Sequence, residues 1–330
     1  MSWSSLPRSH FPLIILAWTS ILVHFLIIIV IRKFRKRNQL YQNPYITLAL
    51  AQSIPSIMLL LHVELLVRPR EFGLFQLFRA STNSKLAAIL LGLQTAQKSQ
   101  LIIFQIPFAL NLAFTAFVAT LSYHKIWSLP TIALAITLPL SVPVAFVAIP
   151  VQYNVSFVAS GDGINLQTPS ECMAILSIAA QSCSVLTIII CVPLYAVAAY
   201  HSRKTYAYAH NPHIVKQERI HLICALVSFG VIILDSIRAA LLIISTFQHP
   251  IDFALYEAVM PYWYHTTELM CCVQPWVMLV GNVHIRRNLL YLLFNINPTP
   301  VNPAPHSDKS ISLILIAPTP LMRAPQPAYF

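Results

Sequence analysis

Residues Phe11 to Ile31 read FPLIILAWTSILVHFLIIIVI, twenty-one residues with no formal charge, and the basic cluster RKFRKR follows directly at positions 32–37. A helix rises about 1.5 Å per residue, so this run is about 31 Å long as a helix, which matches the hydrocarbon thickness of a bilayer. Short loops rich in lysine and arginine stay on the cytoplasmic side of a membrane. The stretch therefore predicts a first membrane span that begins outside the cell.

The composition agrees with a chain that lies in lipid. Hydrophobic residues make up 57% of the sequence and charged residues 9%, against about 45–50% and 25% in soluble domains. The net charge of +11 lies in clusters beside hydrophobic runs, where basic residues meet a membrane surface. We therefore expect the lipid bilayer, and not nucleic acid, to be the partner of these charges.

Six further hydrophobic runs predict six further spans, at about 45–67, 101–121, 129–151, 172–200, 220–247 and 261–283. The third has a second possible register, from about 86 to 111, which would bury Lys98 and several glutamines inside the bundle. With this topology the inner loops carry twelve Lys or Arg and the outer loops five, including Arg68 and Arg70 in an outer loop at 68–85. The prediction is an all-α membrane protein, a seven-helix bundle with its N-terminus outside and its C-terminus cytoplasmic.

Two segments follow the last span. Residues from about 286 to 296 begin with Arg286-Arg287 and continue with mostly apolar side chains, which is typical of a short amphipathic helix at the inner interface. Residues 297–330 contain eight prolines and are expected to form a disordered cytoplasmic tail. Residues 1–296 form the membrane domain.

Three segments resemble nematode serpentine chemoreceptors of the Srg superfamily, especially the Srv-like members. ALNLAFTAFVATLSYHKIW (109–127) is similar to the third-span exit of that family, with Asn111, Thr115, Ala116, Lys125, Ile126 and Trp127 matching. QPW at 274–276 through the Arg286-Arg287 pair resembles its seventh span and basic exit, and KQERIHL (216–222) resembles the start of its sixth span. The chain departs from the family at Leu112, where arginine is usual.

The resemblance implies a G-protein-coupled chemosensory receptor in the plasma membrane. A small-molecule ligand would bind from outside, and a heterotrimeric G protein would bind at the inner face. It also implies that the third span ends near Asn111. The arginine usual at the position of Leu112 is the one thought to face the G protein, which places efficient coupling in question.

Charged residues inside spans are expensive, so they are the first candidates for a site. Asp235 and Arg238 are three residues apart on one helix face, where they either neutralise each other or act as a ligand or switch pair. Glu268 has His265 one turn before it, which predicts a polar pair that is either hydrogen-bonded or faces the ligand. Lys98 either faces the cavity, where it attracts an acidic ligand or Glu268, or lies at the interface.

Other residues have weaker assignments. Pro275 is either a hinge of the seventh span or a site of plain curvature. Trp127, Trp263 and Trp276 are expected in the aromatic belts at the membrane interfaces, and Glu64 with Arg68 as a pair that snorkels to the outer surface. Asn154 begins an N-glycosylation sequon on the outer side.

Two other classes of function were weighed. A seven-span transporter or channel without G-protein coupling is the alternative, although six glycines in the whole chain and no internal repeat argue against it. The sequence has no HExxH or GxSxG motif, and we expect no enzyme activity. No lysine lies between positions 261 and 283, where a retinal Schiff base would need one, and no cofactor or metal is expected.

Overall fold

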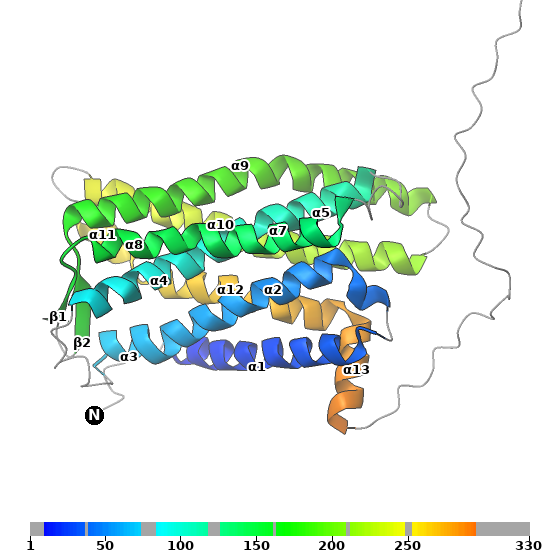
Figure 1. Ribbon diagram of the computed structural model, residues 1–330, viewed down its shortest axis with the longest axis horizontal. Coiled ribbons are helices and arrows are strands. Elements are labelled where there is room, and N and C mark those ends of the chain that lie inside the picture. Colours follow the sequence, from blue (N-terminus) through cyan, green and yellow to red (C-terminus); the bar gives the residue numbers. More distant parts are fainter. Residues whose placement is uncertain are drawn as a thin grey trace, which may run out of the picture.

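The structure is a computed structural model that describes residues 10–36, 39–73, 84–117, 126–160, 163–208, 212–247 and 253–294. Long helices run side by side along one axis, in alternating directions (Figure 1). They are α1 (His10–Phe34), α2 (Pro44–His62), α4 (Ser84–Ile103), α5 (Gln105–Phe117), α7 (Leu129–Ser141), α8 (Ala145–Val151), α9 (Ser170–Tyr208), α10 (Pro212–Phe247) and α12 (Tyr262–Gly281).

Shorter elements lie between and after these helices. They are η2 (Gln39–Gln42), η3 (Val63–Val67, a π-helix), α3 (Arg68–Glu71), η5 (Val142–Val144), the strands β1 (Ser156–Ser160) and β2 (Gly163–Gln167), α11 (Phe253–Val259) and α13 (Val283–Phe294). The strands lie at one end of the bundle and α13 at the other, which we call the hairpin end and the α13 end (Figure 1).

In the described part of the chain, six helical segments are long and apolar enough to cross a membrane. They are His10–Phe34, Pro44–Glu71, Lys85–Thr115, Leu129–Val151, Ser170–Ser202 and Glu218–Ser245. The protein is therefore a helical, multi-pass membrane protein. The twenty-residue α12 packs beside α1 and α10 in the same bundle, but polar residues such as His265, Glu268 and Gln274 lower its hydropathy.

The hydropathy-based register of the third span is wrong. The span begins at Lys85 and continues through α4 and α5 to Thr115, so it starts where the early register placed it. The helix also extends beyond Asn111 as far as Phe117, against the end implied by the family resemblance. The early start holds because Gln97, Ser99 and Gln105 are buried inside the bundle, where polar side chains escape lipid.

The segment at 68–85 is not all loop. Arg68 and Arg70 belong to α3, which continues η3 without a break, and both side chains are buried. The helix ends at Glu71, and Gly73 turns the chain away from it with a φ of 66°, in the left-handed region that glycine adopts without strain. Two of the basic residues that opposed the predicted orientation are therefore inside the bundle, paired with carboxylates.

The hairpin was not predicted. β1 and β2 pair antiparallel, from Ser156 opposite Gln167 to Ser160 opposite Gly163. Gly163 packs directly on α3, because a Cβ built there would lie 1.7 Å from the carbonyl oxygen of Glu71. Asn154 precedes β1 and is exposed, so the side chain that begins the predicted sequon is accessible.

The predicted interfacial helix corresponds to α13, which begins at Val283, three residues before the expected start. It lies across the bundle axis (Figure 1). Asn282 caps it, because its Oδ1 accepts from the backbone N–H of His284 at 3.0 Å. Asn288 donates to the hydroxyl of Tyr41 in η2 at 2.7 Å, and burial raises the pKa of that hydroxyl to about 12.

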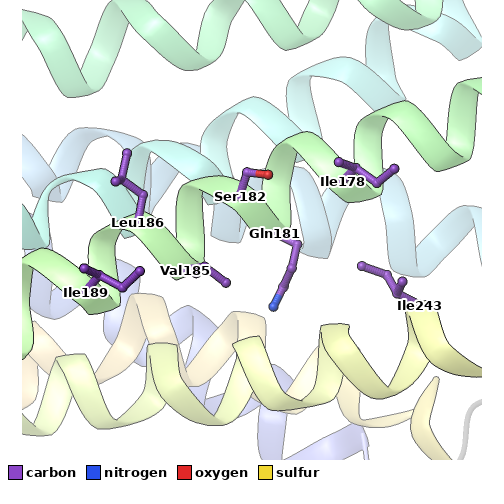
Figure 2. Close-up of a pocket in the computed structure, with 7 residues that line it drawn as sticks. All are labelled: Ile178, Gln181, Ser182, Val185, Leu186, Ile189 and Ile243. Atoms are coloured by element: carbon purple, nitrogen blue, oxygen red, sulfur yellow. The ribbon is translucent and has the colours of Figure 1, made fainter.

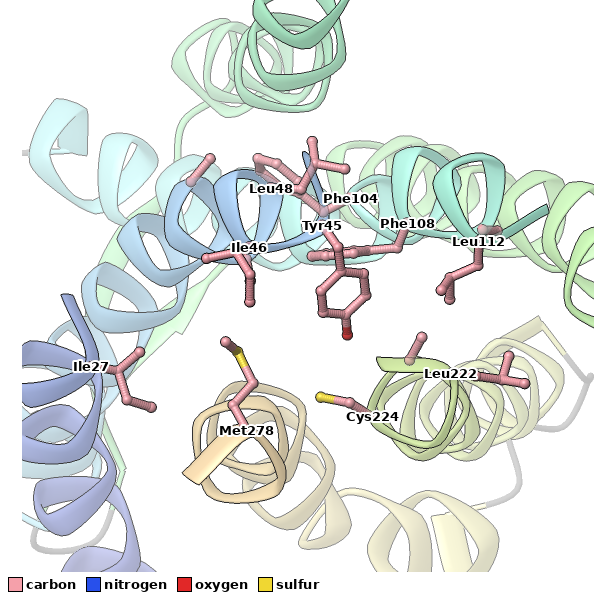
Figure 3. Packing of buried hydrophobic residues seen from close by; sticks show 14 of the residues in the cluster. Ile27, Tyr45, Ile46, Leu48, Phe104, Phe108, Leu112, Leu222, Cys224 and Met278 are labelled. Carbon is pink, nitrogen blue, oxygen red and sulfur yellow. The ribbon is translucent and has the colours of Figure 1, made fainter. Parts of the chain in front are cut away.

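The α13 half of the bundle is filled by an apolar cluster. Tyr45 of α2, Phe108 and Leu112 of α5, and Cys224 of α10 point into it (Figure 3). Met278 of α12 packs against these residues (Figure 3). Leu112, the position of the family arginine, is 6% exposed and packs as an ordinary core residue.

Candidate functional site

Three helices meet at the carboxylate of Asp235. Its Oδ1 accepts from Nζ of Lys98 at 2.8 Å, Nε of Arg238 at 3.1 Å and the hydroxyl of Thr266 at 2.7 Å. Asp235 is 2% exposed. We call Lys98, Asp235, Arg238 and Thr266 the Asp235 cluster; it ties α4 to α10 and α12.

A second group lies on another side of α12. Arg68 donates through Nη1 to Glu64 and through Nη2 to Glu268, and the exposed fractions of the three side chains are 2%, 3% and 0%. We call Glu64, Arg68 and Glu268 the Arg68 cluster. It ties the end of the second span to α12, and the guanidinium also lies 5.2 Å from the ring centre of Tyr264.

The Arg68 cluster is covered from the hairpin end. The hydroxyl of Tyr264 donates to Glu71 at 2.5 Å, and Arg70 pairs with the same carboxylate at 3.3 Å. The ring of His10 packs edge-on against Tyr264, with 4.9 Å between ring centres. The first residues of α1 therefore help to close the bundle above the buried charges.

The two clusters carry opposite charge excess. The Asp235 cluster has two cations and one carboxylate, whereas the Arg68 cluster has two carboxylates and one cation. Both clusters also hold buried polar atoms without a hydrogen-bond partner: Nη1 of Arg238 in the first, and Nε of Arg68 and Oε2 of Glu268 in the second. Buried polar groups are nearly always paired with protein or water, so these atoms have capacity for a further hydrogen bond, to water or to a ligand.

The predicted intrahelical pair of Asp235 and Arg238 is confirmed, and Lys98 faces the interior as the early register requires. Of its two predicted partners, an acidic ligand or Glu268, the second is wrong. Lys98 pairs with Asp235, while Glu268 pairs with Arg68. The reason is geometric: Glu268 and Thr266 are two residues apart on α12, about 200° around the helix, so Glu268 does not face Asp235.

His265 and Glu268 do not form the expected pair. Nδ1 of His265 lies 3.3 Å from the carbonyl oxygen of Pro261. Glu64 and Arg68 also do not snorkel to a surface, because both are buried and Arg68 bridges to α12. The sequence paired Arg68 only with Glu64 on its own helix, whereas the structure adds Glu268 of α12 as a second partner.

Of the four residues expected to act in switching and coupling, Asp235 and Arg238 belong to the Asp235 cluster, whereas Asn111 and Pro275 lie apart from both clusters. Asn111 is buried in α5, in the half of the bundle that holds Leu112. Pro275 lies inside α12, which continues through it. Trp127 is 7% exposed and belongs to the apolar cluster, so its assignment to an interface belt was wrong, because its side chain packs inside the bundle. Lys125 lies outside the described residues.

Three participants were missed from the sequence: Thr266, Glu71 and Arg70. A threonine in an apolar helix is unremarkable in sequence, and only the packing of α12 against α10 reveals its bond to Asp235. The RPRE run at 68–71 was the available signal. Two arginines and a glutamate directly after an apolar run indicate either a loop or a buried ion-pair network.

A separate groove of about 390 Å³ lies on the outside of the bundle between α9 and α10 (Figure 2). It is lined by Ile178, Gln181, Ser182, Val185, Leu186, Ile189 and Ile243. Gln181 points toward α10 (Figure 2) and donates to the hydroxyl of Ser236 at 3.0 Å. The exposed isoleucine and leucine side chains have the composition of a lipid-facing surface.

Within the described residues, no group of three or more His, Cys, Asp or Glu side chains is arranged to hold a metal ion. The chemistry available to the two clusters is therefore ion pairing and hydrogen bonding. No family model matches the sequence, and no curated protein matches it.

Proposed function

We propose that this protein is a G-protein-coupled chemosensory receptor that binds a small molecule among its helices toward the hairpin end. The observation that carries the proposal is the pair of buried charge clusters that join the second span, α4, α10 and α12. Ionisable side chains inside a membrane bundle are expensive and mark functional sites by default. A ligand that bonds with either cluster changes how these helices hold together.

The contrast between the two halves of the bundle supports a receptor. Polar and charged groups gather around Asp235 and Glu268, whereas the α13 half is packed with apolar side chains such as Phe108 and Leu112. A ligand enters a polar site from the outer side, and the packed apolar half rearranges to meet a partner inside the cell. A two-state bundle of this kind shifts its populations when the ligand prefers one state.

α12 is the proposed transmission element. It carries Thr266 and Glu268 in one half and Met278 in the other, with Pro275 between them. Proline removes a backbone hydrogen bond and permits a helix to bend. A change at the charge clusters would therefore alter the angle at Pro275 and the packing of Met278.

Seven spans with an outer N-terminus complete the proposal. α12 is long enough to cross a bilayer at about 1.5 Å per residue, and its polar groups find partners inside the bundle. The basic cluster after α1 favours a cytoplasmic α13 end. The three segments that resemble Srv-like chemoreceptors are consistent with this arrangement.

A transporter is the second candidate, because ion pairs that join several helices also line ion paths in membrane proteins. The test is expression with an N-terminal epitope, followed by second-messenger and ion-flux recordings against a panel of odorants. The receptor proposal expects a ligand-dependent second-messenger response. Ligand-dependent ion flux without a second-messenger response would replace it with transport.

A further inference from the structure

We propose that the Asp235 cluster binds the carboxylate of an organic monocarboxylate ligand, with Arg238 and Lys98 as its charged contacts. The proposal names the ligand class for the receptor site described above and therefore rests on that proposed function. It starts from the charge count: Lys98 and Arg238 share one carboxylate, so the cluster has a surplus of one positive charge.

The excess positive charge of the cluster lies at Arg238. Arg238 is 8% exposed and uses Nε for Asp235, while its Nη1 is buried without a partner. A buried donor on a charged group that has lost its water and gained no partner is costly. An anion beside Nη1 would supply the missing acceptor and balance the charge in one step.

The Arg68 cluster does not supply that balance. Its surplus is negative, and Oε2 of Glu268 is unpaired, but Glu268 lies about 200° around α12 from Thr266, which faces Asp235. Neither of these two unpaired atoms serves as the other's hydrogen-bond partner. The acceptor for Arg238 must therefore come from outside the two clusters.

The ligand is a monoanion with an organic body. One negative charge balances the surplus of one, whereas a dianion such as a phosphate monoester would leave the buried site negative. The ring of Trp263 lies 6.0 Å from Nζ of Lys98, and the backbone carbonyl of Trp263 accepts from Thr266 at 3.3 Å. An aromatic face beside the charged groups favours benzoate-like carboxylates over a halide ion.

The test uses the full chain purified into lipid nanodiscs, with thermal unfolding as the readout. The probes are sodium benzoate and sodium acetate, compared with benzamide, acetamide and sodium chloride, with a bulky buffer anion holding the ionic strength constant. A ligand that binds only the folded state raises Tm by mass action. We expect benzoate to raise Tm by several degrees, acetate by less, and the two amides and chloride by nothing measurable.

The variants are chosen so that charge balance is kept. Arg238→Gln leaves the balanced pair of Lys98 and Asp235, and Lys98→Gln leaves the balanced pair of Arg238 and Asp235, so each should fold and lose the response to benzoate. If one of them fails to fold, the other carries the same test. Glu64→Gln removes one charge from the Arg68 cluster and should keep the full response.

Three results would overturn the proposal: no Tm increase with either carboxylate, an equal increase with the neutral amides or chloride, or an unchanged benzoate response in both Arg238→Gln and Lys98→Gln. The outcome is separable from the receptor proposal. A benzoate response in a protein that never produces a second messenger keeps the site and removes the function. Signalling to neutral odorants without a carboxylate response does the reverse.

Discussion

Arg68 donates to the carboxylate of Glu268, 200 residues further along the chain, with both side chains buried. The same guanidinium holds Glu64, one turn before it on its own helix. One side chain therefore pairs with two carboxylates and joins the second span to α12. In the proposed orientation the hairpin end lies outside, and this pairing explains why an arginine is tolerated there against the positive-inside pattern.

Replacing Arg68 with methionine should remove folded protein from the membrane. It leaves Glu64 and Glu268 facing each other without a cation, and breaking a buried ion pair costs about 3–5 kcal/mol. Surface level by N-terminal epitope staining and Tm in nanodiscs are the measurements. Glu64→Gln is the matched control, because Arg68 keeps Glu268. Equal surface levels for Arg68→Met and Glu64→Gln would contradict a bridging role.

Asp235→Asn should destabilise the protein more than Arg238→Gln does. The first change leaves Lys98 and Arg238 as neighbouring buried cations, whereas the second leaves a balanced pair. Buried like charges repel strongly at low dielectric. Thermal unfolding in nanodiscs, at matched lipid composition, ranks the two variants. A lower Tm for Arg238→Gln would show that the charge count does not govern this site.

Gly92→Ala should destabilise the protein, while Gly230→Ala should not. A Cβ at Gly92 would lie 2.6 Å from the Cα of Val147 in α8, whereas one at Gly230 meets no atom within 4 Å. Both glycines lie inside helices, so alanine brings each the same gain in helix propensity, about 1 kcal/mol. The difference in Tm isolates the close packing of α4 on α8. Equal Tm values would mean that the two helices are not in contact at Gly92.

Leu112→Arg should lower the amount of folded protein, even though the receptors that this segment resembles usually have arginine there. Leu112 is buried among Phe108, Tyr45 and Leu222, and none of these supplies a carboxylate. An unpaired buried cation costs several kcal/mol. Leu112→Met is the control of similar volume, expected to cost less than about 1.5 kcal/mol. Full surface expression of Leu112→Arg would mean that this apolar cluster opens to water.

The contact between η2 and α13 should weaken at alkaline pH. Burial raises the pKa of Tyr41 to about 12, against about 10 for an exposed tyrosine. The folded state therefore keeps the neutral hydroxyl, and this contribution to stability is complete below about pH 10 and is lost as the pH rises toward 12. Between pH 8 and 12, Tm should fall less steeply with pH for Tyr41→Phe than for the wild type. An equal fall of Tm in both proteins would show that Tyr41 ionises as freely as an exposed tyrosine.

Hydropathy was sufficient for most of the fold. The expected boundaries of the fourth span, 129–151, match the segment Leu129–Val151, and the helix now seen as α13 was expected within three residues of its start. The length of an apolar run predicts the bounds of a span directly, because a helix needs about 20 residues to cross a bilayer. For the third span, hydropathy predicted the wrong register, since its polar residues Gln97 and Gln105 are buried inside the bundle and do not face lipid.

The candidate site was predicted only where its contacts are local. The pair of Asp235 and Arg238 follows from a spacing of three on one helix. The bonds of Lys98 to Asp235 and of Arg68 to Glu268 span 137 and 200 residues, and helix periodicity does not state which helices are neighbours. The hairpin of β1 and β2 was missed although its strands pair locally, from Ser156 opposite Gln167 to Ser160 opposite Gly163.

The number of passes through the membrane is the claim on which the receptor proposal depends. Epitopes fused to both ends of the chain test it, with antibody staining of intact and then permeabilised cells. Seven spans predict that the N-terminal epitope stains on intact cells and the C-terminal epitope only after permeabilisation. Both epitopes on the same side would mean that α12 does not cross the bilayer, and would contradict the receptor topology.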